Sequence, residues 1–167
     1  ALLGSNNYAE SAIRQWINSN AAANAWWKST NNFDRPSSNA NIAGMLHGMD
    51  SDFLAVVRTV QVPCKTNNTF ELPGWTKNTA YTLNDRFFLA SINEVGFATE
   101  SGIPEGTVFG AYDGAANVDR IKYVMANKST ARNWWLRSPY PSYASNARRV
   151  VTSGALNYSG AITAYGV

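Results

Sequence analysis

The run Trp-Trp-Leu-Arg-Ser-Pro at residues 134–139 is the most informative stretch of this sequence. It places two bulky rings beside a guanidinium and ends at a proline. Because side chains alternate along a strand, one tryptophan can face a core and the other the opposite side. We expect at least one of the two rings to be buried. We also expect Arg137 to be held by loop carbonyls or by an acid from residues 1–119.

Other elements are predicted on either side of this run. Two further strand-like pieces follow it, at residues 147–151 and 160–164. Upstream, apolar spacing and capping residues predict several short elements. Helices are predicted at 8–17, 50–57, 92–95 and 118–125, strands at 60–62 and 86–91, and loops at 29–41, 63–84 and 96–108. The pattern indicates one mixed α+β domain with short elements and long loops, and long loops are often functional.

Composition excludes several classes of protein. The 167 residues fit one domain, and no stretch reaches the ~18 consecutive apolar residues of a membrane-spanning helix. One cysteine excludes an internal disulfide framework and a Cys-rich zinc site, and one histidine excludes a His-rich metal site. We therefore expect no cofactor, no metal and no membrane insertion. The start of the chain shows no signal peptide, and the missing Met suggests a processed or trimmed N-terminus.

Charge is distributed unevenly along the chain. Residues 1–119 hold seven Lys/Arg and eleven Asp/Glu, whereas residues 120–167 hold seven Lys/Arg and no acid. Two interpretations stay open. The two parts can attract each other within one fold, or the basic C-terminal part can face an anionic ligand.

Motifs for common catalytic chemistry are absent. The chain contains no phosphate-cradling Gly-rich loop, no dinucleotide fingerprint and no G-x-S-x-G nucleophile turn. His47 and Cys64 are best explained as packing or turn residues. Glu100 and Glu105 lie in one loop without the spacing of a calcium site. A carboxylate pair of the glycosidase type remains an alternative that no spacing selects.

Four motifs in order resemble a known family of phage and bacterial proteins with a C-type-lectin-like fold. They are Tyr8–Asn18, Asp85–Glu94, the run at 134–139 and the final Gly166-Val167. The family usually continues with Arg-Pro, where this chain stops at Val167. The resemblance implies a single C-type-lectin-like α+β domain over residues 1–167. Such a domain has a small antiparallel sheet with flanking helices and long loops.

Two branches of that fold do not suit this chain. The formylglycine-generating enzymes use a pair of cysteines, and only Cys64 exists here. The calcium-dependent sugar binders carry Glu-Pro-Asn or Gln-Pro-Asp and Trp-Asn-Asp triplets, which this sequence lacks.

The chain resembles a third branch, the variable proteins of diversity-generating retroelements. In those systems, adenines in Asn codons are replaced at random, which cannot produce Trp, Gln, Glu, Lys or Met. Residues 138–167 contain none of these five types, whereas residues 1–137 contain 21. If these five types occurred in residues 138–167 as often as in the rest of the chain, a segment of this length would lack all of them with a probability of about one percent. The segment is also dense in Tyr, Ser, Asn and Gly, the residues of adaptable binding surfaces. The alternative is that these residues are there because they favour hairpins and turns, without any role in binding.

The resemblance implies a non-enzymatic protein that displays a diversified binding surface on its segment 138–167. The expected framework residues are Trp134, Trp135, Leu136, Arg137, Ala147, Arg148, Val150 and Gly154. The expected ligand-binding residues are Tyr140, Ser142, Tyr143, Asn146, Arg149, Thr152, Asn157, Tyr158, Ser159, Thr163 and Tyr165. Of these, we expect Tyr140, Tyr143, Asn157, Tyr158 and Tyr165 to be exposed on one face.

The partner implied is a protein or glycan receptor on a target cell, and not a nucleic acid. The protein would act on a virion or cell surface, as the C-terminal domain of a larger assembly. Two alternatives stay open. One is an invariant adhesin or carbohydrate-binding module that stacks sugars on Trp26, Trp27 or Trp75. The other is an enzyme with an unrecognised carboxylate pair.

Overall fold

The Trp-Trp-Leu-Arg-Ser-Pro run forms an edge strand of a three-stranded antiparallel sheet. The computed structural model describes residues 6–30, 39–69, 71, 74–124 and 127–160. The strand order is β5-β6-β7, with bounds β5 (Trp134–Pro139), β6 (Asn146–Val150) and β7 (Leu156–Gly160). The first two predicted C-terminal strands are thus confirmed. Most of the third, 160–164, lies outside the described residues.

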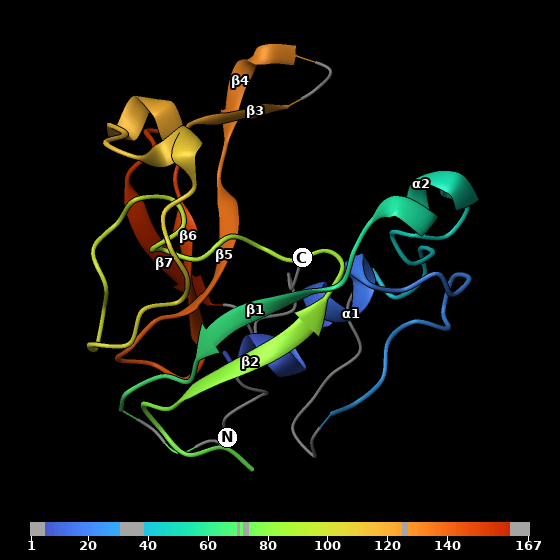
Figure 1. The fold of residues 1–167 in the computed structure, drawn as a ribbon, viewed down its shortest axis with the longest axis horizontal. Coiled ribbons are helices and arrows are strands. Elements are labelled where there is room, and N and C mark those ends of the chain that lie inside the picture. The colour runs from blue at the N-terminus through green and yellow to red at the C-terminus, as the bar shows by residue number, and fades with distance from the viewer. Residues whose placement is uncertain (1–5, 31–38, 70, 72–73, 125–126, 161–167) are drawn as a thin grey trace.

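Two smaller antiparallel sheets complete the strands of the described chain. They pair β1 (Val60–Lys65) with β2 (Ala80–Asp85), and β3 (Lys122–Val124) with β4 (Asn127–Arg132). Figure 1 shows the β5-β6-β7 sheet at one side, the β1–β2 hairpin across the centre and the β3–β4 hairpin projecting beyond the sheet. The helices are short: η1 (Tyr8–Glu10), α1 (Ala12–Ile17), α2 (Ser51–Val56), η2 (Gly110–Tyr112) and η3 (Asn117–Arg120). The fold is therefore a small α+β arrangement with small antiparallel sheets.

Side-chain caps set the limits of the helices. The predicted helix over residues 8–17 is divided at Ser11, whose extended backbone ends η1 while its hydroxyl accepts a bond from the Arg14 amide. Such an N-cap supplies an acceptor for an otherwise unpaired helix amide. Asp50 caps α2 in the same way, whereas Ser51, the other cap that the sequence allows, is the first residue of the helix. Arg14 then binds Asp85 at 2.7 Å, which ties α1 to the end of β2. Among the described residues, no helix has both the length and the apolar content to cross a membrane.

A first core cluster forms between the β1–β2 hairpin and the N-terminal helices. Its buried members are Tyr8, Val62 and Cys64, with Tyr81 and Leu83 packed against them. Tyr81 and Leu83 alternate with exposed neighbours along β2, which is the pattern of a strand with one buried face. The expectation of a loop over residues 63–84 is therefore wrong for β2, and β1 continues through Pro63 to Lys65.

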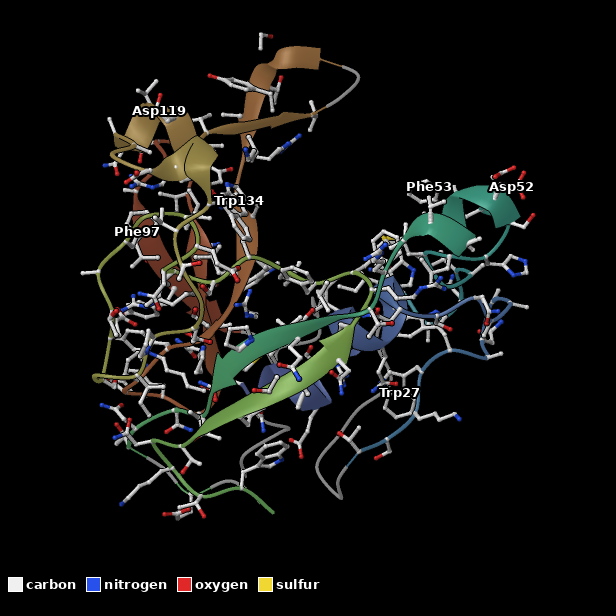
Figure 2. The ribbon with its side chains drawn as sticks, in the orientation of Figure 1. Trp27, Asp52, Phe53, Phe97, Asp119 and Trp134 are labelled. Atoms are coloured by element: carbon white, nitrogen blue, oxygen red, sulfur yellow. The ribbon has the colours of Figure 1, made fainter. Side chains whose placement is uncertain are left out.

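A second core cluster lies between the three-stranded sheet and the chain at residues 90–97. Ile92, Val95, Leu136 and Val150 are its buried members. Trp134 packs against them and donates its indole N–H to the Arg120 carbonyl at 3.0 Å. Figure 2 shows Trp134 beside this sheet, far from Phe53 on α2. Both Trp134 and Trp135 stay partly exposed, so the expectation of a fully buried ring is not met.

Two apolar segments adopt a different structure from the predicted one. Residues 86–91 are irregular rather than a strand. The Leu89 carbonyl accepts from the Arg137 guanidinium, and the Ala90 carbonyl accepts from the Arg137 main-chain amide on β5. The expected helix at 92–95 is a turn. The expected helix at 118–125 stops at Arg120, and β3 follows it. Val118 is 67% exposed, so the helical spacing of apolar residues at 118–125 does not correspond to a buried helix face.

Gly154 allows the turn after β6 to approach η3. Its φ is +81°, and a Cβ there would lie 1.6 Å from the Asn117 carbonyl oxygen. Only glycine fits both the left-handed backbone and this contact. Its place in the predicted framework agrees with this packing.

Arg137 joins the two clusters through backbone carbonyls and one acid. The residue is 2% exposed, and its guanidinium donates to the carbonyls of Pro63, Leu89 and Glu105 at 2.7–3.0 Å. It also binds both oxygens of Glu94, at 2.6 and 2.7 Å. The expectation that Arg137 is held by loop carbonyls or by an upstream acid is confirmed in both forms.

Replacing Arg137 by methionine should destabilise the fold strongly. Glu94 would stay buried without its partner, and three carbonyls would lose a donor. Breaking a buried ion pair from one side costs about 3–5 kcal/mol. Urea unfolding of Arg137→Met should show this loss. The exposed Arg132→Met is the matched control and should change the unfolding free energy by less than about 0.5 kcal/mol. Equal midpoints for Arg137→Met and wild type would contradict the role given to this residue.

Candidate functional site

Three tyrosines of the C-terminal segment stack on one another at the surface. Tyr140 follows β5 directly, Tyr143 lies in the turn between β5 and β6, and Tyr158 lies on β7. The ring centroids of Tyr140 and Tyr158 are 3.9 Å apart at 15°, and those of Tyr140 and Tyr143 are 5.8 Å apart at 20°. Tyr143 is 55% and Tyr158 40% exposed, while Tyr140 between them is half-buried. We call these three residues the tyrosine stack.

An ion pair supports the tyrosine stack from within the fold. Arg148 pairs with Tyr158 across β6 and β7, and its guanidinium carbon lies 4.6 Å from the Tyr140 ring centroid and 5.9 Å from that of Tyr158. The same guanidinium binds the Glu100 carboxylate through two nitrogens, with Nε at 3.0 Å from Oε2. A planar guanidinium can make both contacts at once, because its edge donates hydrogen bonds while its face covers a ring. The loop that carries Glu100 is thereby attached to the stack.

Asn6 fixes the turn that carries two of the tyrosines. Its side-chain amide lies within 2.8–3.2 Å of the carbonyl oxygens of Tyr140, Tyr143 and Asn146. The turn is also closed by main-chain bonds from Tyr140 to Asn146 and from Asn146 to Tyr143. Asn6 is 5% exposed, so these carbonyls obtain a protein donor where water has little access. No sequence pattern indicates this role, since an asparagine near the start of a helix is ordinarily interpreted as a cap.

The structure divides the predicted binding residues between two faces of the sheet. Tyr158 shares its face with Arg148 and with the core residues of β6 and β7. Neighbouring strand residues point to opposite faces, so Arg149, Asn157 and Ser159 lie on the other face. The expectation that Asn157 shares a face with the tyrosines is therefore wrong.

The remaining predicted residues fall into two groups. Ser142 and Thr152 are exposed in turns, and Asn146 is half-buried where it closes the tyrosine turn. Thr163 and Tyr165 lie outside the described residues.

A buried pair of opposite charges lies beneath the Glu100 loop. Lys65 is 1% exposed and donates to the Glu100 carbonyl at 2.6 Å, and its ammonium is 3.9 Å from the Glu105 carboxylate. Burial raises the pKa of Glu105 to about 7, and it lowers the pKa of Lys65. No spacing in the sequence could have indicated this pair, because Lys65 comes from β1 and Glu105 from a distant loop.

The single cysteine and the single histidine of the sequence lie in different environments. Burial raises the pKa of Cys64 to about 12, so its thiol stays protonated at neutral pH. His47 is exposed and contacts the Asn20 carbonyl at 2.9 Å. Among the residues that the structure describes, no three His, Cys, Asp or Glu side chains gather as metal ligands.

The tryptophans of the carbohydrate-binding alternative differ in exposure. Trp26 is buried and bonds to the Ile42 carbonyl, so it is not available as a sugar platform. Trp75 is partly exposed, and its ring centroid lies 4.7 Å from that of Tyr81. Its indole N–H donates to the Glu10 carboxylate. Trp27 is also partly exposed.

Removing the Asn6 amide should loosen the tyrosine turn. We expect Asn6→Ala to cost about 1–3 kcal/mol of unfolding free energy, because buried carbonyls lose their donor. Amide hydrogen exchange at Tyr140 and Asn146 should become faster. The exposed Asn41→Ala serves as control and should leave both quantities near wild type. Unchanged exchange at the two amides in Asn6→Ala would show that the turn holds without this residue.

Metal removal should leave the protein unchanged. We expect a chelator of calcium and zinc to leave the melting temperature where it is, because the sequence holds one histidine, one cysteine and none of the lectin calcium triplets. Calorimetry with EDTA, followed by addition of each metal, checks this. A lower melting temperature that metal restores would overturn the expectation.

Comparison with known proteins places the chain in a family without giving its activity. The model of one protein family, described as Domain of unknown function (DUF6273), matches residues 2–167. No curated protein and no solved structure matches the chain. Because the match covers nearly the whole sequence, the chain belongs to the DUF6273 family of domains of unknown function.

Proposed function

We propose that this chain is a non-enzymatic ligand-binding domain that presents a diversified surface on its segment 138–167. The tyrosine stack is the observation that carries the proposal. Exposed tyrosines offer a large contact area at a small entropy cost, and aromatic residues dominate the energy of many interfaces. A monomer without a partner gains little from two tyrosines at 40% and 55% exposure.

Rigid support of the stack favours recognition over a mobile loop. Asn6 holds the turn, and Arg148 with Glu100 holds the inner side of the rings. Prior ordering reduces the entropy lost on binding. The small antiparallel sheets and long connections fit the C-type-lectin-like fold that we propose for the domain.

The composition of the segment supports diversification. Residues 138–167 lack every residue type that adenine replacement in Asn codons cannot reach. We propose that the ligand is a protein or glycan receptor on a target cell, met on a virion or cell surface. A near-copy of the DNA for residues 133–167, differing mainly at adenines and next to a reverse transcriptase gene, would support this. A genome without such a copy would favour an invariant adhesin.

The buried positions of Glu94 and Glu105 argue against these two carboxylates as a glycosidase-type pair. Glu94 bonds to Arg137 and to the Ser91 amide, and Glu105 is fully buried. A glycosidase-type pair must reach a sugar from both sides, which these two cannot do from inside the fold.

The tyrosines should be required for binding and dispensable for folding. We expect the double variant Tyr143→Ser and Tyr158→Ser to melt within a few degrees of wild type, because surface changes usually cost less than about 0.5 kcal/mol each. Any interaction found on a glycan array or a panel of purified cell-surface proteins should be lost. Tyr123→Ser, on the exposed β3, is the matched control and should keep the interaction.

The opposite pattern would favour the first alternative. If the double tyrosine variant binds a glycan like wild type while Trp75→Ala abolishes binding, the domain is a carbohydrate-binding module with a different site.

A further inference from the structure

Glu105 holds a buried carboxylate that the fold leaves poorly compensated. The residue is 0% exposed, and neither carboxylate oxygen makes a hydrogen bond of good geometry, although the Ser138 hydroxyl and the Lys65 main-chain amide lie near enough to stabilise its charge in part. Its backbone is fixed, because its amide bonds to Asn93 and its carbonyl accepts from Ser91 and Arg137. The ammonium of Lys65, 3.9 Å away, forms its ion pair. A buried carboxylate with so few partners favours its neutral form, and burial raises the pKa of Glu105 to about 7.

The other ionisable groups facing Glu105 keep their charge state around neutral pH. Burial raises the pKa of Cys64 on β1 to about 12 and raises the pKa of Tyr81 on β2, so both stay neutral. Arg137 on β5 stays charged and is paired with Glu94. Lys65 is the group that responds, because the negative charge of Glu105 supports its buried ammonium.

A short chain of contacts connects Lys65 to the tyrosine stack. The Lys65 ammonium donates to the Glu100 carbonyl at 2.6 Å. The Glu100 side chain binds Arg148, whose guanidinium lies over the rings of Tyr140 and Tyr158. When Glu105 takes up a proton, the Lys65 ammonium loses its ion-pair partner. It must then shift toward Glu100 or release its own proton, and either change alters the bond to the Glu100 loop.

We propose that Glu105 is a pH-sensitive switch that sets the position of the Glu100 loop, and with it the tyrosine stack. In the ionised state, Glu105 holds Lys65 against the Glu100 backbone, and the Arg148 guanidinium keeps its place against the rings of Tyr140 and Tyr158. Uptake of one proton from solvent releases this arrangement. A change in ligand affinity with pH rests on the proposed function, whereas the movement of the rings does not.

The test follows the carboxylate and the rings together in the free protein. With glutamate labelled at the carboxyl carbon and tyrosine labelled in the ring, NMR is recorded from pH 5 to pH 9. We expect the Glu105 carbon to titrate with a midpoint of about 7, and the ring signals of Tyr140 and Tyr158 to change position with the same midpoint. In Glu105→Gln the ring signals should no longer change between pH 5 and pH 9. His47→Gln removes the only imidazole of the sequence and is the control, which should keep the wild-type midpoint.

Stability gives a second readout with a defined sign. The pKa of Glu105 in the fold exceeds the ordinary 4.5, so its contribution to stability is complete below that pH and is lost as the pH rises through about 7. Glutamine does not ionise. The unfolding free energy of Glu105→Gln should therefore increase relative to wild type as the pH rises from 5 to 8.

Several outcomes would overturn the switch. A Glu105 carbon that titrates near 4.5 would show that Glu105 does not sense neutral pH. Ring signals that change with a different midpoint in the wild type, or that change equally in Glu105→Gln, would show that the rings are not coupled to Glu105. If that variant does not fold, the comparison of midpoints in the wild type still decides. No ligand is present, so the result is independent of whether tyrosine variants lose binding.

Discussion

The bidentate pair between Arg137 and Glu94 is the interaction on which the rest of the structure depends. Both groups are buried, and a charge removed from water is tolerated only when its partners saturate it. Glu94 supplies the counter-charge, and the carbonyls of Pro63, Leu89 and Glu105 take the remaining donors. One side chain of β5 thereby fixes the β1–β2 hairpin, the irregular segment before Ile92 and the Glu105 loop. The pH-sensitive pair and the support of the tyrosine stack both start from that loop.

Sequence patterns predicted elements whose signals are local. The β5 run, β6 and the Asp50 cap of α2 depend on alternation or on a single hydrogen bond between near neighbours. The prediction of a strand at residues 86–91 was wrong because a strand and an irregular buried segment share the same apolar composition. What separates them is the donor for their carbonyls, which here is Arg137 from far along the chain. The Lys65–Glu105 pair and the Asn6 contacts also arise only after distant segments meet.

The charge asymmetry of the chain is explained in part by attraction between its two parts within one fold. Arg137 and Arg148 bind Glu94 and Glu100, so two basic residues of the last third are neutralised by acids from the first part. Lys122 and Arg132 face each other across β3 and β4, and both are exposed. Like charges placed opposite each other destabilise a hairpin slightly. The Lys122 ammonium lies over the rings of Tyr112 and Trp134, so it contacts aromatic faces within the fold. The internal attraction acts under the tyrosine stack, and the exposed surplus lies on a different hairpin.

The fold separates the groups that hold the proposed binding surface from the side chains that form it. Asn6 bonds to main-chain carbonyls at Tyr140, Tyr143 and Asn146, which any residue at those positions would provide. Arg137 likewise contacts main-chain carbonyls and one acid outside residues 138–167. Substitution of the tyrosines thus leaves the contacts of Asn6 and Arg137 intact, as the proposed diversified surface on a constant scaffold requires. Arg148 differs, because its own guanidinium must meet Glu100. It therefore belongs to the scaffold although it lies within residues 138–167 and contacts the rings.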